Sequence, residues 1–152
     1  MIIVSACLCG INTRYDGNNN LNEKAAMLLK EGKAVLVCPE QLGGLGTPRP
    51  AHEIKDGTGA EVLDGFAKVI SINGENGTLM FIKGAEETVK IAKQIGAEAA
   101  VLKAKSPSCG CGKIYDGSFS KTKIDGNGVT AELLIRNGIK VYTEEDMEFI
   151  KL

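Results

Sequence analysis

The stretch MIIVSACLCG (residues 1–10) joins a short apolar run to two cysteines. Its first six residues are apolar or small and partly β-branched, which predicts a buried strand. No basic residue precedes the apolar run, so we interpret it as a first strand and not as a secretory signal peptide. Cys7 then follows the end of this strand.

The same arrangement occurs twice more along the chain. Residues 34–37 form a second apolar run that ends at Cys38, and residues 99–102 form a third that precedes Cys109. A fourth short run covers residues 139–142. Runs of this length, rich in Val and Ile, are typical of strands that are buried on both faces.

Helical patterns separate these runs. Apolar residues recur at helical spacing over 21–31, with Asn22 as a cap, and over 78–95. Residues 129–136 and 144–150 predict two more helices. Strands that alternate with helices predict an α/β fold: a single domain over residues 1–152, with a short, mainly parallel sheet and helices on both faces, as a Rossmann-like three-layer arrangement.

Two further segments complete this prediction. Residues 39–59 are rich in Gly and Pro and predict a long, shaped loop. Residues 69–72 predict a strand paired with a neighbour across the turn-rich stretch SINGENGT (71–78). The tripeptide YDG occurs twice, at residues 15–17 and 115–117. In both copies we expect Asp to fix a turn and Gly to supply an unusual backbone angle.

Composition excludes several classes of function. The 152 residues are 43% hydrophobic and 24% charged, with a formal net charge of −1, which gives no electrostatic case for a nucleic-acid or membrane-surface partner. No apolar run approaches the ~20 residues of a membrane span. The expected location is therefore the cytoplasm. The sequence does not indicate an oligomeric state.

Five cysteines are many for a cytoplasmic chain, and their number is odd, so metal, cluster or thiol chemistry is favoured over structural disulfides. Parallel strands end at one edge of a sheet, where such folds bind ligands, so Cys7, Cys38 and Cys109 should converge there. Each of the pairs Cys7/Cys9 and Cys109/Cys111 would offer two thiols on one face if the chain were extended.

The residues alone leave the bound group open. A structural zinc needs four ligands, which the three convergent cysteines and His52 would supply. An iron–sulfur cluster suits widely spaced thiolates beside glycine-rich loops, and three cysteines would leave one iron open to a substrate. A thiol enzyme is less well supported, because His52 is the only histidine available as a base.

A set of motifs resembles one known family over essentially the whole chain. In order, these motifs are SACLCG (residues 5–10), RYDG (14–17), VCPEQLGG (37–44), PRP (48–50), LKAKSPSCG (102–110), KIYDGSFS (113–120), GNGVTAELL (126–134) and NGI (137–139). They resemble the TudS-type thiouracil desulfidases. The resemblance implies a compact α/β domain with a [4Fe–4S] cluster held by three cysteines. It also implies hydrolytic, non-redox removal of sulfur from a thiolated uracil.

The resemblance also implies roles for single residues. Cys7, Cys38 and Cys109 would be the cluster ligands, Glu40 the catalytic acid/base, and Ser106 an active-site hydroxyl. The partner would be a small thio-heterocycle, and the product its oxo form with hydrosulfide. Cys9 and Cys111 depart from the family pattern, and we interpret them as packing residues.

Arg14 and Arg49 stand in motif loops and are candidates for binding the heterocycle or a phosphate, because Arg suits planar, bidentate recognition. The alternative is a structural bond to loop carbonyls or to a nearby Asp. Two alternative functions also stay open: a non-catalytic zinc or cluster module, and a desulfidase of thiolated nucleosides within RNA.

Overall fold

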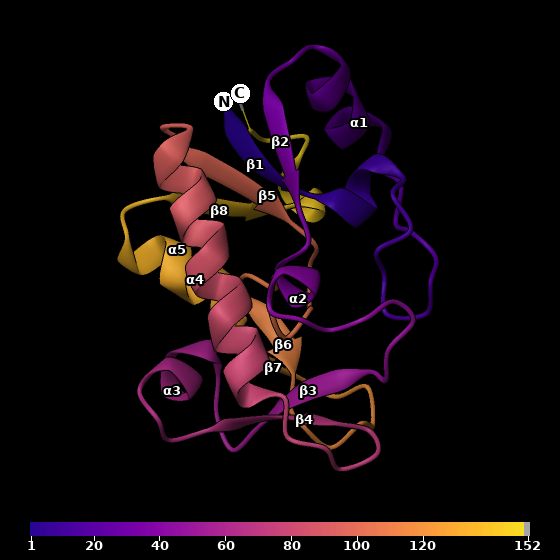
Figure 1. Cartoon of the computed structure of the whole chain (residues 1–152), viewed down its shortest axis with the longest axis vertical. Helices are drawn as coiled ribbons and strands as arrows, with labels where there is room; N and C mark the ends of the chain where they lie inside the picture. The colour runs from indigo at the N-terminus through magenta and orange to yellow at the C-terminus, as the bar shows by residue number, and fades with distance from the viewer. Residues whose placement is uncertain (151–152) are drawn as a thin grey trace.

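The computed structural model describes residues 1–150; the last two residues of the predicted domain, 151–152, lie outside it. At its centre is a parallel sheet of β2 (Ala34–Val37), β1 (Ile2–Ser5), β5 (Ala99–Leu102) and β8 (Lys140–Thr143), in that order (Figure 1). All three strand pairings are parallel. These are the four predicted strands, displaced by one residue or less at their ends.

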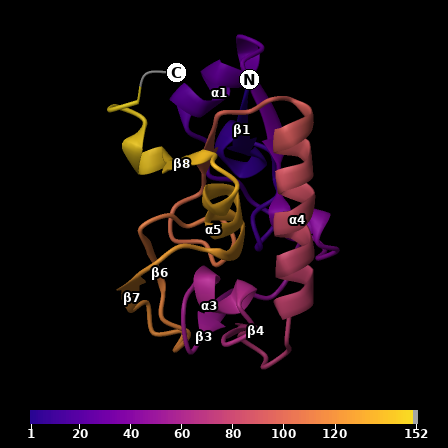
Figure 2. The same ribbon diagram turned by 90° about the vertical axis from the view of Figure 1, so that its left-hand side faces the viewer.

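Helices cover both faces of this sheet, as predicted. Residues of β1 alternate between the faces: Ile2 and Val4 pack with α1 (Glu23–Lys30), whereas Ile3 packs with α4 (Thr78–Gln94) and α5 (Val129–Arg136). Figure 2 shows α4 and α5 side by side. The Asn22 side chain caps α1 by accepting a hydrogen bond from the Ala25 N–H at 3.1 Å. None of the described helices is both long and apolar enough to cross a membrane.

Two antiparallel strand pairs extend the molecule beyond the carboxyl edge of the sheet (Figure 1). One pairs β3 (His52–Lys55) with β4 (Lys68–Ser71), and the other pairs β6 (Lys113–Tyr115) with β7 (Lys123–Asp125). The short helix α3 (Gly59–Leu63) and the first turns of α4 pack with them around a separate apolar cluster. That cluster contains Ile54, Val62, Ala67, Val69, Phe81, Ala85, Ile114 and Val129.

Two predictions of secondary structure were wrong. Residues 39–59 are not one loop, because they contain α2 (Pro39–Leu42), β3 and the start of α3. Residues 144–150 do not form a helix: a single 3₁₀ turn, η2 (Glu144–Asp146), follows β8. In η2 the side chain of Asp146 accepts a hydrogen bond from the N–H of Thr143, which is the N-cap residue of the turn.

Helix α2 packs closely against α4 because two glycines lie at the contact. A Cβ atom added to Gly84 would lie 1.9 Å from the Pro39 carbonyl oxygen, and one added to Gly43 would lie 2.0 Å from the Met80 carbonyl oxygen. Both glycines therefore permit a backbone approach that any side chain would prevent. This contact fixes the position of α2, which carries Glu40.

Candidate active site

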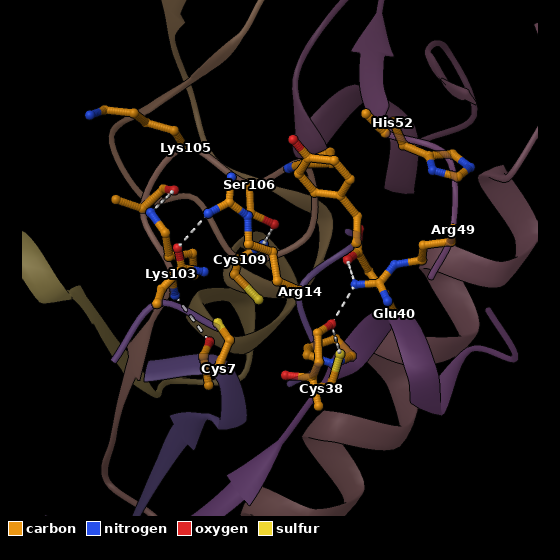
Figure 3. A pocket seen from close by; sticks show the side chains of 18 of the residues that line it. Cys7, Arg14, Cys38, Glu40, Arg49, His52, Lys103, Lys105, Ser106 and Cys109 are labelled. Carbon is orange, nitrogen blue, oxygen red and sulfur yellow. Dashed lines mark hydrogen bonds and ion pairs between the residues drawn. The ribbon is translucent and has the colours of Figure 1, made fainter. Parts of the chain in front are cut away.

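A cavity of about 450 Å³ lies at the carboxyl edge of the parallel sheet (Figure 3). This volume falls within the range of roughly 300–1,000 Å³ that is usual for small-molecule sites. Every side chain that the sequence singled out as a site residue lines it: Cys7, Arg14, Cys38, Glu40, Arg49, Ser106 and Cys109. The three cysteines that follow different strands thus line one cavity, as expected.

Each of the three cysteines follows a different strand. Cys7 lies in the 3₁₀ turn η1 (Ala6–Cys9) directly after β1, and Cys38 is the N-cap of α2 directly after β2. Cys109 lies in a turn beyond β5 that the hydroxyl of Ser106 organises. The Ser106 Oγ accepts hydrogen bonds from the Ser108 N–H at 3.1 Å and the Cys109 N–H at 3.0 Å.

Burial sets the charge state of these thiols. It raises the pKa of Cys7, Cys38 and Cys109 above the ordinary value. At Cys109 the neighbouring carboxylate of Glu40 and the other two thiols raise the pKa further. The thiols therefore remain protonated near neutral pH unless a cation takes the place of the protons.

The arrangement of the donors argues against a single metal ion. Within residues 1–150, no group of three His, Cys, Asp or Glu side chains lies close enough to hold one metal ion. A zinc site needs such a group, whereas the cysteines of a cubane cluster each bind a different iron and stand farther apart. His52 also lines the cavity, but its Nδ1 lies 2.8 Å from the Pro50 carbonyl oxygen and its ring packs beside Phe81.

The other two cysteines point elsewhere. Cys9 Sγ lies 3.5 Å from the Ala25 carbonyl oxygen in α1, and Cys111 Sγ lies 3.6 Å from the Val141 carbonyl oxygen in β8. The condition under which each cysteine pair would present both thiols on one face, an extended backbone, is not met, because Cys7 and Cys9 lie in a 3₁₀ turn and Cys109 lies in a turn of its own. Neither sulfur is part of the described lining of the cavity.

Arg49 is buried and bonded to protein groups. Its guanidinium donates to the Thr13 carbonyl oxygen at 2.9 Å, the Gly46 carbonyl oxygen at 3.2 Å and the Thr47 hydroxyl at 2.9 Å. It also donates to Glu40 Oε2 at 2.5 Å. Among the described residues, only its Nε is a buried side-chain polar atom without a partner. Arg49 thus fixes Glu40 and the loops around it.

Arg14 is more accessible. Its guanidinium donates to Asn20 Oδ1 at 3.3 Å, lies 3.5 Å from Asp16 Oδ2, and stands over the ring of Tyr15 at 5.4 Å. The side chain is 38% exposed and lines the cavity. Of the two arginines, Arg14 has the more accessible side chain, because Arg49 is only 4% exposed.

Sequence reasoning missed several residues of the cavity wall, and the repeated YDG motif is a signal that would have indicated only those in or beside its two turns. Both YDG turns have the expected geometry: Asp16 and Asp116 each accept a hydrogen bond from the N–H two residues on, and both glycines have positive φ. Both turns also bring residues to the cavity. The wall residues that the sequence did not indicate include Tyr15, Asn20, Glu53, Lys103, Lys105, Tyr115, Phe119 and Lys121.

Comparison with known proteins places this arrangement in a family. A family model described as 2-thiouracil desulfurase matches residues 2–146. The chain is 49% identical over 150 residues to the uncharacterized protein YbbK of Bacillus subtilis (strain 168), with 99% of each chain covered. The solved structure of a [4Fe–4S]-dependent thiouracil desulfidase, TudS, matches with a TM-score of 0.85 and 40% identity, over 97% of this chain and 92% of that one. The resemblance drawn from the motifs is confirmed, and the chain belongs to the 2-thiouracil desulfurase family.

Proposed function

We propose that this protein is a [4Fe–4S]-dependent desulfidase that hydrolyses a thiolated uracil, such as 2-thiouracil, to the oxo base and hydrosulfide. One observation carries the proposal: the three cysteines that follow β1, β2 and β5 line a single cavity together with a carboxylate that is held by a buried arginine. Membership of the 2-thiouracil desulfurase family and the likeness to TudS support it.

Cys7, Cys38 and Cys109 would hold the cluster. Because Cys9 and Cys111 bond to carbonyl groups away from the cavity, one iron would have no cysteine ligand. When bound, the cluster supplies a soft Lewis acid for the thiocarbonyl sulfur. The raised pKa of the three thiols means that loading the site releases protons.

Glu40 would act on water. Its side chain is 16% exposed and faces the cavity, and its Oε2 is fixed by Arg49, so its other carboxylate oxygen is available to take a proton. The water oxygen bonds to the ring carbon, the C–S bond breaks, and sulfur leaves as hydrosulfide. The proton that Glu40 accepted then returns to the products. Water and the thiocarbonyl supply every atom of the products, and no net electrons are transferred.

Ser106 would orient the reacting groups. Two backbone N–H groups already donate to its Oγ, so the remaining function of the hydroxyl is to donate its own proton. Ser106 lines the cavity, so that donor would lie beside the substrate or the attacking water. The same hydroxyl shapes the turn of Cys109, so one residue serves both the ligand loop and the reaction.

The proposal is tested by anaerobic reconstitution with iron and sulfide, followed by loss of thiocarbonyl absorbance from 2-thiouracil and 4-thiouracil. We expect turnover by the loaded wild-type protein and none by Glu40→Gln with equal iron content. Cluster loading with no turnover of either base would contradict the proposed substrate and favour a non-catalytic module. Turnover only of thiolated RNA would favour the RNA alternative.

A further inference from the structure

The loop between β6 and β7, residues 116–122, has two chemically different sides. Its even-numbered residues are joined through their side chains: Asp116 Oδ1 accepts a hydrogen bond from the Ser118 N–H, the Ser118 and Ser120 hydroxyls pair, and Ser120 pairs with Thr122. On the odd-numbered side, Phe119 and Lys121 line the cavity, as does Tyr115 just before the loop. These hydrogen bonds along the even-numbered side of the loop thus turn the odd-numbered side chains towards the cavity.

The backbone of this loop is shaped around an anion. Gly117, Phe119 and Lys121 all have positive φ, at 92°, 57° and 64°, which is disfavoured for residues that carry a Cβ. Alternation of this kind turns successive N–H groups towards one point and forms a concave anion site. The group in that concavity is the carboxylate of Glu53: its Oε1 accepts hydrogen bonds from the Gly117 N–H at 3.0 Å and the Phe119 N–H at 3.1 Å.

Glu53 belongs to the wall of the cavity. It stands on β3, is 9% exposed, and lines the cavity together with Phe119. The loop is also pressed against β3, since a Cβ atom added to Gly117 would lie 2.6 Å from the Ile54 carbonyl oxygen. A buried carboxylate that accepts two backbone N–H groups holds a loop firmly, because charge-assisted hydrogen bonds are about twice as strong as neutral ones.

We propose that Glu53 is a positioning residue that holds the loop 116–122 in the shape that sets the ring of Phe119 against the heterocycle of the substrate. This rests on the proposed function. A half-buried aromatic ring on a cavity wall offers a flat apolar surface, which suits a planar pyrimidine in offset stacking. The cluster ligands, Glu40 and Ser106 come from other elements, so Glu53 acts on substrate binding and not on the chemical step.

The first test separates binding from chemistry in the reconstituted protein. We expect Glu53→Ala to raise KM for 2-thiouracil about tenfold with kcat within about threefold of wild type, because uniform binding is lost. Glu53→Gln keeps an oxygen acceptor and should recover part of the loss, with KM raised about threefold. The matched control is Glu61→Ala. Glu61 also accepts a backbone N–H, from Thr58 at 3.1 Å, but lies outside the lining of the cavity, so its KM should not change.

A second test does not depend on turnover. The chain contains no tryptophan, so Phe119→Trp creates a single fluorescent reporter on the cavity wall. We expect 2-thiouracil to quench it, and we expect Glu53→Ala in the same background to shift its emission to the red and weaken the quenching. Phe119→Leu should raise KM as Glu53→Ala does. If Glu53→Ala does not fold, the KM values of Glu53→Gln and Phe119→Leu test the proposal.

The outcomes separate this inference from the proposed function. Quenching of the Phe119→Trp reporter, without turnover by the loaded wild-type protein, would support the loop assignment and overturn the proposed function. Turnover with KM values of Glu53→Ala, Glu53→Gln and Phe119→Leu all within twofold of wild type would overturn the loop assignment alone. Neither turnover nor quenching would overturn both.

Discussion

Arg49 donates to Glu40 Oε2 at 2.5 Å, and the Arg49 side chain is only 4% exposed. The other donors of its guanidinium reach Thr13, Gly46 and Thr47, so one buried cation joins the loop after η1 to the loop after α2. A planar fork with several donors is required for this, and an ammonium group cannot reproduce it. The orientation of the proposed catalytic carboxylate therefore depends on Arg49.

Replacement of Arg49 by lysine should impair both the fold and the reaction. We expect the free energy of unfolding of the cluster-free protein to fall by about 2 kcal/mol, because buried carbonyl groups lose their donors. We expect kcat of the loaded protein to fall at least about tenfold as Glu40 loses its fixed orientation. Urea unfolding and steady-state kinetics measure the two effects.

The control for this variant is Arg136→Lys. Arg136 pairs with Asp64 on the surface, outside the lining of the cavity, and such exposed pairs contribute about 0–1 kcal/mol. Its kcat should match that of wild type. An Arg49→Lys protein as stable and as active as Arg136→Lys would show that the Glu40–Arg49 pair has no role in catalysis.

The five cysteines should fall into two groups. Cys7→Ser, Cys38→Ser and Cys109→Ser each remove a proposed ligand, so we expect each to lose most of the iron per chain after anaerobic reconstitution. Cys9→Ser and Cys111→Ser replace sulfurs that bond to carbonyl oxygens elsewhere, so their iron content should equal that of wild type. Loss of iron in Cys9→Ser or Cys111→Ser, with retention in one of the other three, would require a different ligand set.

Ser106→Ala should slow the reaction without emptying the site. The hydroxyl that it removes accepts two N–H groups in the turn of Cys109 and is the proposed donor in the cavity. We expect a fall in kcat of about tenfold or more with most of the iron retained, and partial rescue by Ser106→Thr, which keeps a hydroxyl. Equal activity of the alanine and threonine variants would remove the hydroxyl from the mechanism.

A methyl group added between α2 and α4 should disturb the site from a distance. In Gly84→Ala the new Cβ would lie 1.9 Å from the Pro39 carbonyl oxygen, so α2 must move and take Glu40 with it. We expect a loss of about 3 kcal/mol in unfolding free energy and a large fall in kcat. Glu86→Ala, an exposed position on the same helix, is the matched control and should change neither. A wild-type kcat in Gly84→Ala would show that the close contact between α2 and α4 does not affect the reaction.

The parallel sheet and the meeting of three cysteines were predictable because both follow from local pattern and general topology. Apolar runs such as Ala99–Leu102 are buried on both sides, and parallel strands place the residues that follow them at one edge. The antiparallel pairing of β3 with β4 was not predictable in the same way. His52–Lys55 alternates polar and apolar residues within a Gly- and Pro-rich segment, so its pairing with β4 is decided by contacts distant in sequence.

The site residues also differ in whether local sequence or contacts distant in sequence determine their positions. Cys7 and Glu40 stand in compact motifs and were singled out from the sequence, whereas Glu53 was not, because its partners Gly117 and Phe119 lie more than 60 positions away. The structural bonds of Arg49 were weighed as an alternative from the sequence, but its pairing with Glu40 depends on how two loops meet. The extended backbone that would align a cysteine pair is not adopted at Cys7 and Cys9, which lie in a 3₁₀ turn that has no strong sequence signal.

The most direct measurement is the origin of the oxygen in the product. Loaded wild-type protein is incubated anaerobically with 2-thiouracil in ¹⁸O-labelled water, without reductant or ATP, and the uracil formed is analysed by mass spectrometry with hydrosulfide quantified alongside. Hydrolysis at the Glu40 site predicts one ¹⁸O and one hydrosulfide for each uracil, and no product from Glu40→Gln with the same iron content. Uracil without ¹⁸O, a requirement for a reductant, or full activity of Glu40→Gln would contradict the account.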